Sequence, residues 1–162
     1  MRSLAHRAPS RSRVPPGTFR EIAVADIPDL FHVRTRTREN VLTDEELAGL
    51  GITPASVADR LAATFRGWLC SDDGRVVAFC MADRATGELW VVAVLPAYEG
   101  RGIGGRLMDH AERWLWASGC ARAWLTTDVD TTLRAYGFYR SRGWVDWKIE
   151  DGLRWMQLFA PG

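Results

Sequence analysis

The sequence lacks the features that mark membrane, secreted or nucleic-acid-binding proteins. No apolar run approaches the roughly 18 residues that a membrane-spanning helix needs. The N-terminus has no apolar core of the kind that a signal peptide requires. The formal net charge is only +1, which argues against a general nucleic-acid or membrane-binding surface. We therefore expect a cytoplasmic protein that binds neither nucleic acid nor a membrane.

Cysteine is also scarce. Cys70, Cys80 and Cys120 are an odd number and form no C-x-x-C pair or metal-like spacing. Such cysteines are typical of small buried side chains in a reducing compartment. No metal site is predicted.

The length of 162 residues favours one domain with a substantial core. Residues 1–17 contain four arginines, three prolines and no acid, and they show no hydrophobic periodicity. This composition is typical of a basic arm without regular structure. The domain is then expected over residues 18–162.

The first half of that domain is expected to be one strand followed by helices. A strand is predicted at 18–24, and a helix that Asp26 caps runs to about residue 40. The alternating stretch RTRTREN within that range could instead form an exposed irregular segment. Thr43 and Glu46 have the spacing of a capping box before a short helix, and another helix is predicted over 53–65.

The second half is expected to be mainly strands. Strands at 68–71, 75–83 and 88–95 are separated by tight turns, so they should be antiparallel. After a long helix, a strand at 121–127 should lie parallel to the strand that begins at Glu88. A helix over 131–142 and a hairpin with strands at 144–149 and 153–159 complete the chain.

The most informative stretch joins the strand at Glu88 to that long helix. Gly100, Gly102, Gly104 and Gly105 lie within six residues, with Arg101 and Arg106 among them. A helical pattern then follows, with an apolar face and a polar face. The apolar face is formed by Leu107, Met108, Ala111 and Leu115, while Asp109, Glu112 and Arg113 point away from it. Glycines let the backbone approach a ligand closely, and the first N–H groups of a helix attract anions. The loop is therefore predicted to hold a phosphate or pyrophosphate.

A dinucleotide-binding protein is one alternative. Gly100, Gly102 and Gly105 match G-x-G-x-x-G, and Asp128 follows about twenty residues later. However, four residues separate the strand from the first glycine, and too little chain remains for a doubly wound sheet.

The order of elements and two motifs resemble the GNAT superfamily of acyl-CoA-dependent N-acyltransferases. The segment EGRGIG at 99–104 is similar to the family's acyl-CoA loop, Q/R-x-x-G-x-G/A. The segment FYRSRGW at 138–144 is similar to the family's F-Y-x-x-x-G-F. The resemblance implies a single α/β (α+β) domain whose mixed sheet has about seven strands, a splayed parallel pair and flanking helices.

The resemblance also implies an activity and a binding site. The chain would transfer an acetyl group from acetyl-CoA to a primary amine of a small molecule or peptide, and a module that binds acyl-CoA without turnover is the alternative. A β-bulge at 92–94 would offer a backbone N–H to the thioester carbonyl. The residues implied to contact acyl-CoA are Val92, Ala93, Val94, Gly100, Arg101, Gly102, Ile103, Gly104, Gly105, Arg106 and Thr132.

Two residues are carried over as catalytic candidates. Tyr139 matches the family's tyrosine that protonates the departing thiolate, and Tyr136 is a weaker candidate for that role. Tyr139 could instead be an aromatic core residue. Glu88 occupies a position where some family members have a general base, while others use water. Two alternatives therefore remain open, namely that Glu88 is the general base or that it has no role in the reaction.

The sequence departs from the family pattern at Glu99, where glutamine or arginine is usual. A carboxylate near a pyrophosphate should weaken binding unless its side chain turns away. Trp90 should share a face with Glu88 and border the acceptor. Trp147 and Trp155 are candidates for covering a contact between two copies of the chain, which leaves a homodimer open.

Overall fold

The structure is a computed structural model that describes residues 17–162. The basic arm expected at 1–17 lies outside the described residues, apart from Gly17. None of the helices in the described part is long and apolar enough to cross a membrane.

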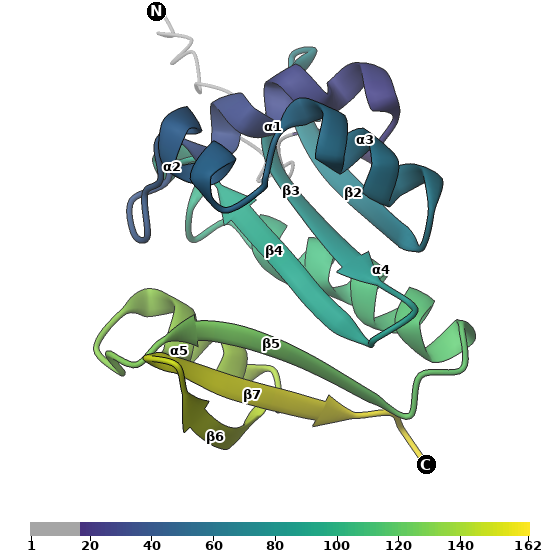
Figure 1. Ribbon diagram of the computed structural model, residues 1–162, viewed down its shortest axis with the longest axis vertical. Coiled ribbons are helices and arrows are strands. Elements are labelled where there is room, and N and C mark those ends of the chain that lie inside the picture. The colour runs from purple at the N-terminus through teal and green to yellow at the C-terminus, as the bar shows by residue number, and fades with distance from the viewer. Residues whose placement is uncertain (1–16) are drawn as a thin grey trace, which may run out of the picture.

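A mixed sheet of seven strands, in the order β1-β2-β3-β4-β5-β7-β6, forms the centre of the molecule (Figure 1). Among the strands of residues 17–162, only β4 and β5 are parallel neighbours, which confirms the expected mixed sheet with one parallel pair. The strands are β1 (Thr18–Glu21), β2 (Phe65–Asp72), β3 (Arg75–Asp83), β4 (Glu88–Val94), β5 (Arg122–Asp128), β6 (Val145–Glu150) and β7 (Leu153–Phe159).

Helices cover both faces of this sheet. Figure 1 shows α1 and α3 in front of β2 and β3, with α4 behind them. On α4, Leu107, Met108, Ala111 and Leu115 are fully buried, which confirms its predicted apolar face. The helices are α1 (Ile27–Arg34), α2 (Asp44–Gly49), α3 (Pro54–Ala62), α4 (Ile103–Ala117) and α5 (Arg134–Ser141), with 3₁₀ turns at Val24–Asp26 and Pro96–Tyr98.

The first helix is shorter than predicted. It ends at Arg34 rather than near Asn40, and the RTRTREN stretch is irregular. The Arg34 side chain donates from Nη1 to the carbonyl of Asn40 at 2.8 Å, which stabilises the turn. Asp26 does not cap α1 with its side chain. Its carboxylate instead accepts hydrogen bonds from Arg20 and the N–H of Ala23, and the Arg20 bonds lower the pKa of Asp26.

The next two helices begin where the sequence predicts. Thr43 Oγ1 accepts from the N–H of Glu46 at 3.1 Å, and the Glu46 side chain accepts from the N–H of Thr43, so the capping box is confirmed. The helix α3 ends at Ala62, before the predicted residue 65, because Phe65 already pairs with Asp83 at the start of β2.

The parallel strands β4 and β5 diverge almost immediately (Figure 1). Glu88 and Trp124 are their single register pair within the described residues. The splayed pair predicted from the family resemblance is therefore confirmed, and it opens a gap beside the rest of β4.

The β-bulge in β4 lies before the predicted position at 92–94. Leu89 pairs with Ala82 and Val91 pairs with Met81, so Trp90 is the extra residue. A bulge places two successive side chains on one face of a sheet. Trp90 and Val91 accordingly both pack toward α1 and α3, whereas Leu89 and Val92 pack toward α4. The bulge thus directs two neighbouring side chains to the same side.

Candidate active site

A cleft of about 730 Å³ follows the gap beside β4. Its walls are β4, the loop before α4, the first turns of α5, and the segment between α1 and α2. The predicted residues that line it are Val92, Ala93, Val94, Gly100, Gly102, Ile103, Gly104, Gly105 and Tyr139.

The glycine loop leads directly into α4, as predicted. Gly100 and Gly102 have φ of +73° and +78°, a region that residues with a Cβ seldom adopt. Gly102 is the N-cap of α4 and supplies no side-chain cap. The first helical bond runs from the N–H of Arg106 to the carbonyl of Gly102, at 3.1 Å. The preceding N–H groups of the first turn have no intrahelical acceptor, so they can bind an anion.

The next two glycines leave space between elements. A Cβ on Gly104 would lie 3.5 Å from the ring of Phe138 and 3.7 Å from a methyl group of Val94. It would therefore project between β4 and α5. A Cβ on Gly105 would lie 3.4 Å from Nη1 of Arg142. Both glycines also line the cleft, where the absence of a Cβ lets a ligand approach the backbone of α4.

Three predicted ligand contacts do not line the cleft. The guanidinium of Arg101 stacks on Tyr98, 5.1 Å from the ring centroid. That of Arg106 stacks on Phe19 at 4.0 Å. Thr132 bonds to the carboxylate of Asp130 through both its N–H and its hydroxyl. Each of these side chains would have to turn to reach a ligand in the cleft.

The backbone of β4 presents donors to the gap. The N–H of Leu95 bonds to the carbonyl of Val77, on the β3 side, at 2.9 Å. Successive N–H groups of a strand point to opposite sides. Those of Val94 and Val92 therefore point toward β5, where the strands have separated. This geometry fits the expected role of residues 92–94, although the bulge lies nearer the start of the strand.

Tyr139 lies on α5 with its ring against Phe138 and Trp144. The residue is 8% exposed and borders the cleft. Burial raises the pKa of the phenol to about 12, so it stays protonated at neutral pH. The described residues supply no hydrogen-bond partner for its hydroxyl. This arrangement differs from that of a core tyrosine with a satisfied hydroxyl, and it leaves a proton donor at the cleft.

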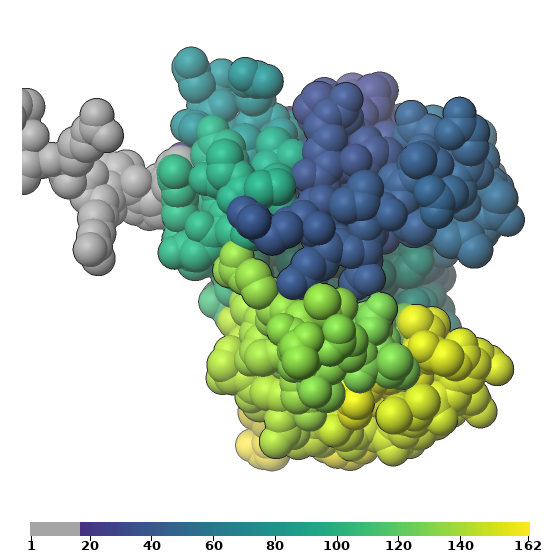
Figure 2. Space-filling model, turned by 90° about the vertical axis from the view of Figure 1, so that its left-hand side faces the viewer, coloured from purple at the N-terminus to yellow at the C-terminus, as the bar shows by residue number. Residues whose placement is uncertain are grey.

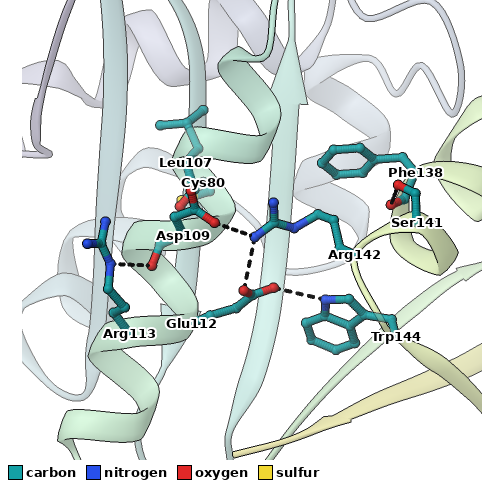
Figure 3. Close-up of polar contacts among 9 residues, drawn as sticks. All are labelled: Cys80, Leu107, Asp109, Glu112, Arg113, Phe138, Ser141, Arg142 and Trp144. Atoms are coloured by element: carbon teal, nitrogen blue, oxygen red, sulfur yellow. Dashed lines mark hydrogen bonds and ion pairs between the residues drawn. The ribbon is translucent and has the colours of Figure 1, made fainter. Parts of the chain in front are cut away.

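An ion-pair network fixes α5 against α4 (Figure 3). Arg142 donates from Nη2 to Asp109 at 2.7 Å and to Glu112 at 3.0 Å. The other oxygen of Glu112 accepts from the indole N–H of Trp144 at 3.0 Å. Asp109 is exposed, as predicted, with its side chain 53% accessible, whereas the Glu112 side chain is only 13% accessible because Arg142 and Trp144 cover it. Helical periodicity did not identify this network, because the partners, Arg142 and Trp144, come from the residues that follow α5.

Glu88 lies outside the lining of the cleft, at the start of β4. Its pKa is raised, first because the carboxyl is buried and then because Asp83 is near, while Arg60 opposes the shift. Trp90 lies two residues later on the strand and does line the cleft. A role for Glu88 as base therefore requires water between the carboxylate and the amine.

Glu99 faces two arginines that the sequence did not single out. Its carboxylate accepts from Nε of Arg38 at 3.1 Å and from Nη1 of Arg134. Glu39 also accepts from the N–H of Arg134, at 3.1 Å. Figure 2 shows the segment around Arg38 between the glycine loop and the start of α5. The charge of Glu99 is thus offset inside the protein, so it is less repulsive to a pyrophosphate than the sequence implied.

Comparisons with known proteins agree with this geometry. The sequence model of the acetyltransferase (GNAT) family matches residues 27–144. The structure of PaiA N-acetyltransferase from Thermoplasma acidophilum, in complex with coenzyme A, superposes with a TM-score of 0.77 at 15% identity over 88% of this chain and 98% of that one. The ribosomal-protein-S18-alanine N-acetyltransferase from Escherichia coli gives 0.69 at 20% identity over 88% and 93%. Ard1 from Thermoplasma volcanium gives 0.69 at 18% over 90% and 99%. At these identities, the superpositions establish the fold.

Proposed function

The chain belongs to the GNAT acetyltransferase family and is an acyltransferase, and from that premise we propose which reaction its cleft performs. It transfers an acetyl group from acetyl-CoA to a primary amine of a small molecule or peptide. The amine attacks the thioester directly, with both substrates bound together.

The glycine loop and the gap beside β4 hold the acyl donor. The N–H groups that begin α4 bind the pyrophosphate, and the positive φ of Gly100 and Gly102 lets the backbone approach it closely. The pantetheine arm lies between β4 and β5, where the strands share a single register pair. Val92 and Val94 direct their N–H groups into the same gap.

The main-chain donors of β4, Tyr139 and Glu88 each have a separate role in the reaction. The N–H of Val92 or Val94 donates to the carbonyl oxygen as negative charge develops there, and such donors typically contribute about 2.7–4 kcal/mol. The amine nitrogen forms a bond to the carbonyl carbon, and the carbon–sulfur bond breaks. Tyr139 gives its proton to the departing thiolate. Glu88 accepts the amine proton through water, or water itself accepts it.

The observation that carries this proposal is the position of Tyr139. Tyr139 lines the cleft, and its hydroxyl is protonated and has no partner among the described residues. The test is release of coenzyme A thiol from acetyl-CoA with a panel of amines. Amine-dependent release supports an acetyltransferase, whereas tight acetyl-CoA binding without release from any amine would support the non-catalytic alternative.

The dinucleotide alternative does not agree with the fold, because β2, β3 and β4 are antiparallel. A thermal shift measured with acetyl-CoA and with NAD gives a direct comparison. We expect stabilisation by acetyl-CoA alone.

Two further proposals concern the oligomeric state and the cellular compartment. The final hairpin carries Trp147, which is 37% exposed, beside Trp155, which stacks on Trp124 at 4.9 Å. We propose this aromatic surface as the contact of a homodimer, and sedimentation would test it.

The small number of cysteines and their spacing support our proposal that the protein acts in a reducing compartment, the cytoplasm.

A further inference from the structure

A second, smaller pocket adjoins the cleft on the side of α1, α2 and α3. Its volume is about 130 Å³, close to the roughly 150 Å³ of an apolar cavity that holds benzene. Its lining is apolar except for one arginine and consists of Leu30, Phe31, Arg34, Leu42, Leu47, Ile52, Val57, Phe79, Met81, Trp90 and Val91. We call this space the apolar pocket.

The apolar pocket is continuous with the cleft. Arg34, Trp90 and Val91 line both spaces. Because of the bulge at Trp90, two successive side chains of β4 face the apolar pocket. The next residue, Val92, lies where the acetyl group is proposed to bind. A ligand whose apolar group occupies the apolar pocket can therefore place its remaining atoms beside the thioester.

Arg34 is the charged residue at this junction. Its Nη1 donates to a backbone carbonyl, that of Asn40, at 2.8 Å. Within residues 17–162, no carboxylate lies within ion-pair distance of its guanidinium. Burial lowers the pKa of Arg34, which reflects the cost of holding this charge away from water. By contrast, the nearby Arg38 is neutralised by Glu99.

Arg34 is thus a partly buried cation without a carboxylate partner, and it lies beside the apolar pocket. This combination suits a ligand that has both an anionic and an apolar group. Guanidinium groups bind carboxylates in a bidentate geometry that fixes orientation as well as affinity. An α-amino acid with an apolar side chain combines these groups with a primary amine.

We propose that the acceptor is a free amino acid with an aliphatic or aromatic side chain. This inference rests on the proposed acetyltransferase function and specifies its substrate class. The side chain occupies the apolar pocket, the carboxylate binds Arg34, and the α-amine faces the thioester beside Val92. The new bond joins the amine nitrogen to the acetyl carbon as the carbon–sulfur bond breaks. Glu88 or water takes the amine proton, and the sulfur takes that of Tyr139.

The experiment compares three acceptors of similar shape, namely L-leucine, L-leucinamide and isoamylamine. The amide keeps the side chain and loses the charge, and isoamylamine lacks the carboxylate altogether. Hydrogen bonds to charged groups are worth enough to give roughly 10- to 100-fold discrimination. We expect kcat/KM for leucine to exceed that for both analogues by this factor. L-Glutamate, which would place a charge in the apolar pocket, should be a poor acceptor.

Two variants test the assignment to Arg34. Arg34→Gln should remove the preference for leucine over isoamylamine, because kcat/KM for leucine should fall far more than kcat/KM for isoamylamine. Arg36→Gln is the matched control, because Arg36 is exposed and bonds to His32 and Thr35 nearby. It should retain the full preference. Leu42→Phe, which narrows the apolar pocket, should impair L-phenylalanine more than L-alanine.

Several results would overturn the inference and leave the acetyltransferase function intact. Equal turnover of leucine and leucinamide, or faster turnover of a peptide amine, would show that the carboxylate is not recognised. A higher KM for acetyl-CoA in Arg34→Gln, with the leucine preference retained, would assign Arg34 to the donor.

A binding measurement covers the case in which no acceptor is turned over. Calorimetry of L-leucine into the coenzyme A-loaded protein should show binding that Arg34→Gln weakens roughly 10- to 100-fold. No binding of leucine would overturn the inference. Failure of acetyl-CoA itself to bind, by contrast, would overturn the proposed function.

Discussion

The glycine loop and the apolar pocket border the same cleft, yet they are built in different ways. In the proposed function the loop binds through the main-chain N–H groups that begin α4, and its glycines contribute by having no side chain. The apolar pocket is made of side chains from three helices, two strands and the segments on either side of α2, with Arg34 as its charged member. Main-chain recognition suits a donor with a constant phosphate group. Recognition by side chains allows the acceptor to be selected by size and charge.

The largest effect should come from filling the loop. Gly102→Val forces a β-branched residue into a φ of +78°, and Gly104→Val adds methyl groups between Val94 and Phe138. We expect acetyl-CoA binding to fall below detection by calorimetry in both variants, with the circular dichroism spectrum largely retained. Gly49→Val is the control, because a Cβ there meets nothing within 4 Å. Unchanged affinity in both loop variants would place the phosphate elsewhere.

Tyr139→Phe should separate chemistry from binding. The loss of a positioned general acid commonly costs about 10²–10⁴-fold in rate. We expect kcat to fall by that factor, with little change in acetyl-CoA affinity and a nearly unchanged melting temperature. Tyr136→Phe is the control, since that hydroxyl bonds to Asp146 at 3.1 Å. A Tyr139 variant with lower stability by about 1 kcal/mol and normal turnover would instead indicate a structural hydroxyl.

Glu88→Gln tests whether Glu88 is the general base that takes the proton of the acceptor amine. If Glu88 is the base, activity rises with pH through its pKa, which burial holds above the ordinary value of 4.5. We expect the variant to lose this acidic limb in a pH profile of kcat/KM. Its rate at neutral pH should fall by about tenfold, below the usual range for a general base, because water can replace the carboxylate. Glu45→Gln, on the exposed face of α2, is the control, and an unshifted limb would make Glu88 a bystander.

The raised pKa of Glu88 also predicts how the stability of the fold depends on pH. The predicted direction is opposite to that expected for a carboxylate in a salt bridge. A folded-state pKa above the unfolded value favours the protonated group, so its stabilising effect is lost as pH rises through the folded pKa. Glu88→Gln should therefore leave the melting temperature at pH 8 unchanged or slightly higher. A clear loss of stability at that pH would show that the ionised carboxylate is needed for folding.

The smallest effect should come from Glu99→Gln. This change removes a negative charge beside the proposed pyrophosphate site and releases Arg38 and Arg134. Both arginines are exposed, and ion pairs at the surface are worth about 0–1 kcal/mol, so acetyl-CoA should bind only about twofold to fivefold more tightly, and less so at high salt. Glu150→Gln, which removes the exposed pair with Lys148, is the control. Weaker binding in Glu99→Gln would mean that the carboxylate positions the arginines for the ligand.

The sequence by itself determined the elements that depend on neighbouring residues. The glycines before α4, the Thr43–Glu46 capping box and the antiparallel strands before β4 were all predicted, because short-range backbone preferences and turn residues specify them. The order of these elements and the motifs at 99–104 and 138–144 were sufficient to predict the family.

Only the tertiary structure decided the contacts between distant residues. The bulge is at Trp90 because pairing with β3 sets the register of β4. Glu99 meets Arg38 and Arg134 across 61 and 35 residues of chain, and Arg34 meets the apolar pocket only where three helices converge on the sheet. Such contacts depend on how whole elements pack, and the local pattern around each residue contains no information about its distant partner.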